Sequence, residues 1–363
     1  MAKRGMNIYK RKDGRWEGRY RDGVKPDGSI KYRSIYGKSY STVKERLTKI
    51  KAFGIEAHSI CNMTVKTLFW EWLSVVKVKT KESTYANYCF KVEKHLLPFF
   101  GAIKFDQLSP KIVYDFMQRK QIDGFSAKYI SDIIVVLKSM AKYTTSVYQC
   151  HNAISDVKLP KKEKKELSLY NSREQDILKR TLLRKTDLTK LGILLCLFTG
   201  IRIGELCSLK WSDVDLEKKL LSINKTVQRI QCSDDVSATK LIITSPKSKS
   251  SVRIIPLPEF LIDCLKDFQT SKDVFLLSNK ESVIDPRTIQ YRFHSILKKA
   301  KLPSMNFHSL RHLFATNCIA LGFDIKTLSE ILGHNSVEVT LNQYVHSSME
   351  RKKECMDLLE LTV

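Results

Sequence analysis

Aromatic and basic side chains alternate with turn residues over the first part of the chain. Residues 6–40 place them between two Asp-Gly pairs, which begin at Asp13 and Asp27, and this spacing predicts three short antiparallel strands. Residues 41–53 then follow helical spacing, with Ser41 as the expected N-cap. The apolar stripe of that helix consists of Val43, Leu47, Ile50 and Phe53. The pattern therefore predicts a small three-stranded sheet closed by one helix.

Helical periodicity dominates the middle of the chain, from residue 62 to residue 158. Its apolar residues recur at the spacings of a helix face, and little of it resembles a strand. Four helices are predicted, over residues 64–77, 83–99, 109–121 and 126–147. The following stretch, 159–166, is highly charged, contains Pro160 and lacks apolar periodicity, so we interpret it as a linker.

The remainder of the chain mixes helix and strand patterns, and we expect one domain over residues 167–346. Helices are predicted over 172–184, 187–199 and 203–210, and residues 218–257 have the pattern of strands. In the tail, 347–363, apolar residues at helical spacing predict a short amphipathic helix.

The expected fold class is therefore multidomain and mainly α with small β elements. It comprises an N-terminal three-stranded sheet plus helix over residues 1–56, a helical domain over 62–158 and a mixed α/β domain that ends before the tail.

The charge balance narrows the class of partner. The 363 residues carry 63 Lys and Arg against 38 Asp and Glu, a formal net charge of +25. Such a surplus exceeds what solubility requires and indicates a polyanionic partner. Because the surplus is spread along the chain, it favours a long polymer over one small acidic ligand.

Cysteine usage and hydropathy exclude several other classes. The nine cysteines stand singly, without a CxxC pair or a Cys/His spacing suited to zinc, which indicates reduced and mostly buried thiols. No apolar run approaches the ~20 residues that cross a bilayer, and the N-terminal stretch lacks the apolar core of a signal peptide. We therefore expect a cytoplasmic protein without a membrane partner.

The predicted N-terminal sheet carries cations and an aromatic side chain that suit a DNA groove. The residues expected to contact DNA are Arg15, Trp16, Arg19, Arg21, Lys31 and Arg33. The alternative is that these residues form the solvated outer face of a small domain.

Groups suited to a phosphodiester occur in four short segments of the last domain. Arg202 follows Gly200 at a predicted helix start, where a guanidinium can bind two phosphate oxygens; a surface salt bridge with Glu205 is the alternative. Lys247 and Lys249 lie in PKSKSS, which we interpret as a tight hairpin. A lysine there can deliver a proton to a leaving oxygen, although hairpin lysines are usually only solvated.

The other two segments contribute histidines and a tyrosine. His308 and Arg311 are three residues apart and share a helix face, although such a cluster can also be a solvated helix end. His334 is expected on the turn after a helix that ends at Gly333, and Tyr344 follows ten residues later. His334 or Tyr344 alone is more often a packed core residue, so the combination carries the hypothesis.

Five motifs, taken together, resemble those of the tyrosine recombinase (phage integrase) family. They are TGIRIGEL, PKSKSS, HSLRH, LGHNS and NQYVH, in the family's order and approximate spacing. The helical middle section is similar to the family's core-binding domain. Residues 1–56 are similar to the arm-binding domain of integrases carried by conjugative transposons and temperate phages.

The resemblance implies a role for each matching residue. Tyr344 would attack a DNA phosphorus, giving a 3′-phosphotyrosine and a free 5′-hydroxyl without ATP. Arg202 and Arg311 would hold the non-bridging oxygens of the phosphate. Lys247 would protonate the leaving 5′-oxygen, with Lys249 as the alternative.

The two remaining roles fall to histidines. His308 would assist proton transfer, and His334 would hydrogen-bond a phosphate oxygen. His312, beside Arg311, is expected to point away from the phosphate and to be structural. No metal or other cofactor is implied, because the cations take the part that metal ions play in two-metal nucleases.

The implied function is site-specific DNA recombination for integration and excision of a mobile element, as in viral genome integration by a phage. The implied partners are double-stranded DNA at core and arm attachment sites, further copies of the chain in a homotetramer on that DNA and, as an option, an accessory excision factor. The C-terminal tail would dock on a neighbouring protomer, with packing against its own domain as the alternative. We expect the protein in the bacterial cytoplasm, associated with the nucleoid when bound to DNA.

Two other functions compete with this interpretation. A type IB topoisomerase shares the tyrosine chemistry but has no need of a basic N-terminal module. A DNA-binding regulator needs the positive charge but has no physical use for the complete set of phosphate-directed residues.

Overall fold

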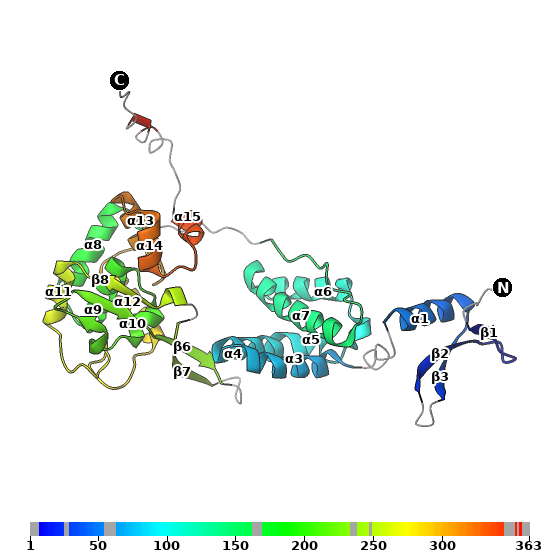
Figure 1. Ribbon diagram of the computed structural model, residues 1–363. Helices are drawn as coiled ribbons and strands as arrows, with labels where there is room; N and C mark the ends of the chain where they lie inside the picture. Colours follow the sequence, from blue (N-terminus) through cyan, green and yellow to red (C-terminus); the bar gives the residue numbers. More distant parts are fainter. Residues whose placement is uncertain are drawn as a thin grey trace, which may run out of the picture. The chain divides into compact units, whose positions relative to one another are not determined.

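The computed structural model describes residues 7–24, 29–53, 63–161, 169–232, 238–246, 249–344, 353 and 356–357. The chain folds into two compact units, Met1–Lys164 with Gln231–Ser237 and Lys165–Ile230 with Ala238–Val363. Helices predominate in the described residues, and short strands occur in both units (Figure 1). The predicted fold class, mainly α with small β elements, is therefore confirmed.

The N-terminal sheet is antiparallel with strand order β1-β2-β3, as predicted. Its strands are β1 (Ile8–Lys10), β2 (Trp16–Val24) and β3 (Ile30–Gly37), and helix α1 (Tyr40–Phe53) packs against them. The helix begins one residue earlier than predicted, because Ser39 rather than Ser41 accepts a hydrogen bond from the Thr42 amide, at 3.2 Å. The second predicted turn, at Asp27, lies outside the described residues.

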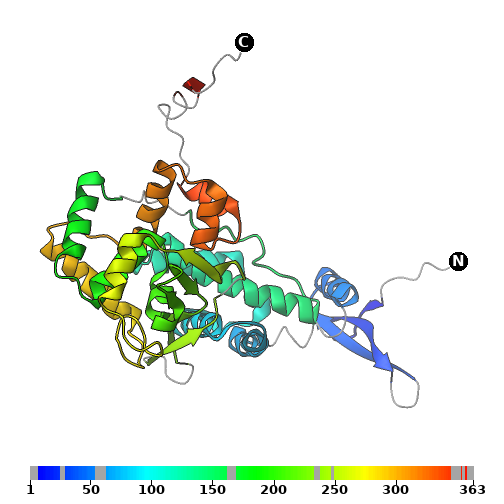
Figure 2. The ribbon, with the colours of Figure 1, turned by 60° about the vertical axis from the view of Figure 1, so that its left-hand side comes forward.

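The rest of the first unit contains the predicted helices. They are α3 (Val65–Lys79), the continuous run α4 (Glu82–Lys91), η1 (Val92–Leu96) and α5 (Leu97–Phe100), then α6 (Pro110–Ile122) and α7 (Ala127–Tyr148). η1 is a π-helical turn, and the short 3-10 helix η2 (Phe105–Gln107) lies between α5 and α6. The side chains of Thr64 and Ser126 cap α3 and α7. α7 packs against α3, α4 and α6 (Figure 2).

The second unit mixes helices with two small sheets. Its helices are α8 (Ser172–Leu183), α9 (Leu188–Thr199), α10 (Ile203–Ser208), α11 (Glu259–Lys266), α12 (Pro286–Lys299), α13 (Ser309–Ala320), α14 (Ile325–Leu332) and α15 (Val337–Tyr344). One sheet has the order β4-β5-β8, with β4 (Val214–Asp215), β5 (Leu220–Ile223) and β8 (Arg253–Pro256), and the other pairs β6 (Thr226–Gln231) with β7 (Thr239–Thr244). Two 3-10 turns, η3 (Trp211–Asp213) and η4 (Lys249–Ser251), complete it.

The strand prediction for residues 218–257 is confirmed, but the predicted hairpin around the two lysines is wrong. β7 pairs with β6, whereas β8 pairs with β5. The segment that carries Lys247 and Lys249 therefore joins two sheets instead of turning between paired strands.

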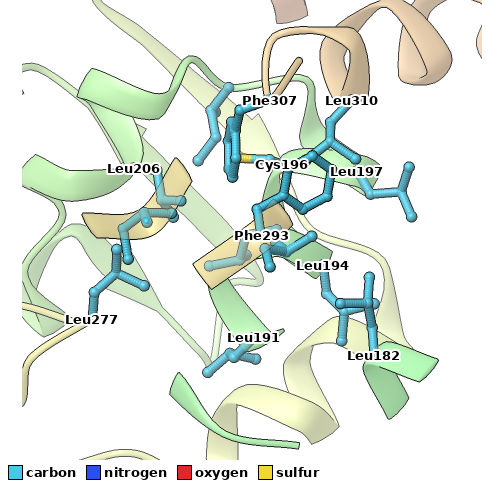
Figure 3. Close-up of a cluster of buried hydrophobic side chains, with 14 of the residues drawn as sticks. Leu182, Leu191, Leu194, Cys196, Leu197, Leu206, Leu277, Phe293, Phe307 and Leu310 are labelled. Atoms are coloured by element: carbon cyan, nitrogen blue, oxygen red, sulfur yellow. The ribbon is translucent and has the colours of Figure 1, made fainter. Parts of the chain in front are cut away.

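Helix α9 forms the centre of the second unit. Every side chain from Leu191 to Leu197 is buried, apart from Gly192, which has none and is itself enclosed. A helix that is apolar all round must be covered on all sides, and α9 is surrounded by α8, α10, α11, α12 and α13. Figure 3 shows Leu182, Leu206, Phe293 and Leu310 packed around it.

Several predictions fall on residues that the structure does not describe. The linker prediction for 159–166 lies mostly outside the described residues, and so does the tail helix predicted over 347–363. The domain boundaries stay a prediction. Among the described residues, no helix combines the length and apolar character needed to cross a bilayer.

Two glycines of the second unit provide a matched test of this packing. Gly200 ends α9 in the left-handed region, with φ of 66°, and a Cβ there would lie 2.5 Å from Phe314 Cδ1 and 2.7 Å from Leu332 Cδ2. Gly322 has φ of 85° and open space around it. We expect Gly322→Ala to lower the free energy of unfolding by about 1 kcal/mol, from backbone strain alone.

Gly200→Ala should cost roughly 2–5 kcal/mol, because overpacking adds to the same strain. Urea unfolding of the full-length chain, followed by circular dichroism, measures both variants. Equal destabilisation of the two would contradict the tight packing of α9 against α13 and α14.

Candidate active site

Four segments of the second unit bring polar side chains to one place. They are the start of α10, strand β8, the start of α13 and the turn between α14 and α15. The residues concerned are Arg202, Glu205, Arg253, His308, Arg311 and His334. Arg202, Arg253, Arg311 and His308 all lie near enough to His334 to lower the pKa of its imidazole, so the predicted residues Arg202, His308, Arg311 and His334 do come together.

Arg202 occupies the N-cap position of α10 and pairs with the helix's third residue, Glu205. Its Nη1 donates to Glu205 Oε1 at 2.9 Å, and its backbone amide donates to Glu205 Oε2 at 3.0 Å. The Arg202 side chain remains 37% exposed, whereas that of Glu205 is only 4% exposed. The ion pair considered from sequence therefore exists, but its carboxylate is buried and lies beneath the site.

A second arginine, Arg253, was not among the predicted site residues. Its Nη2 donates to Glu205 Oε2 at 2.9 Å and its Nη1 to Glu205 Oε1 at 3.3 Å, while its Nε donates to the Ile331 carbonyl at 2.5 Å. Burial opposes ionisation of Glu205, but the hydrogen bonds and charges of Arg253 and Arg202 outweigh it and hold the pKa of this carboxyl below its usual value. The sequence signal was a cation at the start of an otherwise apolar strand.

Arg311 is buried, with 2% of its surface exposed, and lies where two helices end. Its Nη1 donates to the Gly200 carbonyl at 2.8 Å and its Nη2 to the Leu332 carbonyl at 2.7 Å. These carbonyls belong to the ends of α9 and α14, where helix carbonyls lack intrahelical partners and carry partial negative charge. The two helix ends therefore fix the guanidinium in place.

His308 precedes α13 and packs edge-on against His312, with ring centroids 4.9 Å apart. Desolvation by the surrounding protein, together with the charges of His312, Arg311 and Arg202, lowers the pKa of His308 to about 4, although the side chain is partly exposed. His312 is buried, as its predicted structural role requires, and burial followed by Arg311 lowers its pKa. At neutral pH both rings are uncharged.

His334 stands on the predicted turn, directly after Gly333 ends α14 in the left-handed region with φ of 67°. Its Nδ1 is hydrogen-bonded to Thr340 Oγ1 at 2.8 Å, which sets the orientation of the ring. Burial, followed by the charges of Arg311 and Arg202, lowers the pKa of His334 to about 4. The imidazole is therefore neutral and held by its Nδ1 side.

The proposed nucleophile and general acid are less fully described. Tyr344 is the last residue of α15, which packs against α13 and α14, but its side chain lies outside what the structure describes. Lys247 lies outside the described residues, and of Lys249 only the backbone, at the start of η4, is described. The choice between the two lysines stays open.

The N-terminal sheet corrects part of the predicted DNA-binding face. Trp16 packs against the core between sheet and helix, with its ring 5.2 Å from that of Tyr40, and Tyr20 is buried there. Arg33 lies opposite Tyr20 and so projects from the same face, although it is exposed. Neighbouring strand residues point to opposite faces, so the six predicted residues cannot share one surface.

The other face of this sheet does combine cations with aromatic rings. Arg19 belongs to it, and Arg15 lies with its guanidinium carbon 5.6 Å from the ring centre of Tyr36. Tyr9 and Tyr36 are exposed on this face and were missed, although strand alternation places them there. The side chains of Arg21 and Lys31 lie outside what the structure describes.

Two family models match the chain. The model described as "Phage integrase family" matches residues 167–351, a range that contains the whole candidate active site. The model described as "Phage integrase, N-terminal SAM-like domain" matches residues 64–121, within the helical section of the first unit.

Individual proteins match over most of the chain. The tyrosine recombinase XerC-like protein of Caldanaerobacter subterraneus subsp. tengcongensis is 26% identical over 325 residues, 82% of this chain and 83% of the relative. The Tn1549 transposon integrase in complex with a circular intermediate DNA has a TM-score of 0.69 at 20% identity, covering 82% of this chain and 100% of that one. A lambda integrase tetramer bound to a Holliday junction has a TM-score of 0.60 at 16% identity, covering 93% and 95%. These two structures share the fold.

The lowered pKa of His334 can be tested in the protein without DNA. The His334 Hε1 resonance should titrate with a midpoint near pH 4, below the usual ~6.5, because burial and the nearby arginines disfavour the imidazolium. Histidine-labelled protein measures this by NMR, with His334→Gln assigning the resonance. In the unfolded chain the His334 imidazole becomes protonated near pH 6.5, whereas in the folded chain it stays neutral until near pH 4. Its contribution to the free energy of unfolding is therefore fully present above pH 6.5 and is lost as the pH falls toward 4. A midpoint near 6.5 would contradict the buried and cationic surroundings of His334.

Proposed function

The chain belongs to the phage integrase family, whose model matches just over half of it, and from that membership we propose that the candidate active site cuts and rejoins DNA through a 3′-phosphotyrosine intermediate. The protein is a tyrosine-type site-specific DNA recombinase. The observation that carries the residue assignment is the convergence of Arg202, His308, Arg311 and His334 from separate elements.

Arg202 and Arg311 form the cationic part of the site. Arg202 is anchored through Glu205 while more than a third of its side chain stays exposed, as binding of an incoming phosphate requires. Arg311 is buried and is fixed by two helix ends. Both charges act on His308 and His334, so one phosphate placed beside the imidazoles lies in the field of both arginines. Preorganised cations of this kind stabilise the charge that develops in the transition state.

The two histidines take complementary roles. Nδ1 of His334 is hydrogen-bonded to Thr340, and we assign its Nε2 to a phosphate oxygen: Nε2 carries a proton to donate when the Thr340 hydroxyl donates to Nδ1. His308 is neutral and partly exposed, so it can accept a proton and release it again.

Tyr344 is the proposed nucleophile. Its phenolic oxygen gives up its proton, which His308 can accept, and forms a bond to phosphorus as the bond to the 5′-oxygen breaks. Lys247, or alternatively Lys249, gives that 5′-oxygen its proton. Attack by a 5′-hydroxyl on the phosphotyrosine reverses the step and restores the phosphodiester. Because one ester replaces another, the cycle needs no ATP.

The substrate is double-stranded DNA at core and arm sites, and the product is an integrated or excised mobile element. Support comes from the net charge of +25 and from the related fold of a transposon integrase solved with a circular intermediate DNA. We also propose a homotetramer on DNA, as in the lambda integrase structure on a Holliday junction, with an accessory excision factor as an optional partner. The cell compartment that fits these partners is the bacterial cytoplasm.

Tyr344→Phe tests the nucleophile directly. Only a hydroxyl is lost, so we expect core-site binding within about threefold of wild type and no covalent protein–DNA complex. A nicked suicide duplex, on which the released strand diffuses away, traps the adduct for detection on a denaturing gel. Adduct formation by the variant at a tenth of the wild-type level would refute the assignment.

Replacing the leaving 5′-oxygen by sulfur shows which of the two lysines is the general acid. A thiolate leaves without a proton, so Lys247→Ala should cleave the 5′-bridging phosphorothiolate duplex at nearly the wild-type rate, while losing roughly a hundredfold on the ordinary duplex. Lys249→Ala provides the matched control. Rescue of Lys249→Ala instead of Lys247→Ala would transfer the general-acid role to Lys249.

A further inference from the structure

Arg253 is a buried guanidinium that joins three parts of the second unit. Its side chain is 6% exposed, and that of its partner Glu205 is 4% exposed. Besides both oxygens of Glu205, it donates to the carbonyls of Ile331 and Ser251. These contacts link β8 with the start of α10 and with the last turn of α14.

The two ends of this bridge carry residues of the proposed active site. Glu205 accepts hydrogen bonds from Arg202 as well as from Arg253, so one carboxylate fixes a partly exposed and a buried arginine. Ile331 lies in the turn of α14 that leads to Gly333 and His334. Displacing Arg253 would therefore release one constraint on Arg202 and another on the His334 turn.

Close packing at Gly333 shows that the turn rests directly on this guanidinium. A Cβ at Gly333 would lie 3.1 Å from both Cδ and Nη1 of Arg253, and 3.0 Å from the Ser250 carbonyl oxygen. Next to it, Ser250 Oγ donates to Asn335 Oδ1 at 2.7 Å. The segment after Lys249 is thus also fastened to the His334 turn.

We propose that Arg253 is a positioning residue for strand cleavage, which sets Arg202 through Glu205 and His334 through the Ile331 carbonyl without touching DNA itself. The proposal rests on the function proposed above for Arg202 and His334. An arginine suits this place because its planar fork can donate to both carboxylate oxygens and still present Nε to a carbonyl. A lysine offers one nitrogen and cannot make all of these bonds from one position.

The test compares DNA binding with single-turnover cleavage in the full-length chain. For Arg253→Gln we expect affinity for a core-site duplex within about threefold of wild type, because the ground-state contacts with DNA remain. The cleavage rate at saturating DNA should be at least about tenfold lower, because Arg202 and His334 are misplaced. Arg253→Lys should recover part of the rate, since it restores the charge but not the fork.

Two further variants separate positioning from loss of folding. Lys225→Met is the matched control, because it also removes a cation from a buried carboxylate, Asp213, at 3.0 Å in the same unit. It should destabilise the unit without the tenfold loss of cleavage relative to binding. Glu205→Gln combined with Arg253→Gln leaves no buried charge unpaired, and it keeps the comparison possible if Arg253→Gln alone does not fold.

Coupling to Arg202 decides whether the effect is transmitted as proposed. In an Arg202→Ala background, Arg253→Gln should slow cleavage by at most about threefold, because part of what it positions is already gone. Independent effects that multiply, or a wild-type cleavage rate in Arg253→Gln, would overturn the proposal. Failure of the wild-type chain to form any covalent adduct would instead refute the proposed function, so the two failures are distinct.

Discussion

The carboxylate of Glu205 is buried and is neutralised by two guanidinium groups, that of Arg202 three residues away and that of Arg253 48 residues away along the chain. Removing a carboxylate from water costs several kcal/mol, and loss of one partner from a buried pair typically costs ~3–5 kcal/mol. The positions of Arg202 and Arg253 are therefore tied to the fold of α10 and β8. This constraint lets an exposed arginine keep one geometry at a surface, where a side chain of its length would otherwise be free to move.

Arg311 extends the same principle to the helices. Its guanidinium caps both α9 and α14 by donating hydrogen bonds to their final carbonyls, which have no partners within their own helices. Two left-handed glycines make this possible: Gly200 and Gly333 stop the helices at the point where the carbonyls turn toward the site. The core around α9 and the cations of the proposed active site are consequently parts of one structure.

Much of this could be predicted from sequence, for identifiable reasons. The helices follow from apolar periodicity, and α9 shows the all-apolar pattern of a helix covered on every side. Arg202, His308, Arg311 and His334 were found because each belongs to a short motif. Arg253 was missed because its partners, Glu205 and Ile331, lie 48 and 78 residues away, and no local pattern encodes such contacts. Trp16 was misplaced because a list of strand residues ignores which face each one occupies, and the hairpin at Lys247 because strand pairing is not local.

In the proposed function, fixed positive charge at this site compensates the negative charge of a phosphate. A core-site duplex with a methylphosphonate at the cleaved position tests it, since that linkage is neutral. Arg202→Ala should lose roughly a hundredfold in cleavage rate on the ordinary phosphodiester but less than about tenfold on the methylphosphonate, each relative to wild type on the same duplex. An equal loss on both duplexes would show that Arg202 does not act by compensating the phosphate charge.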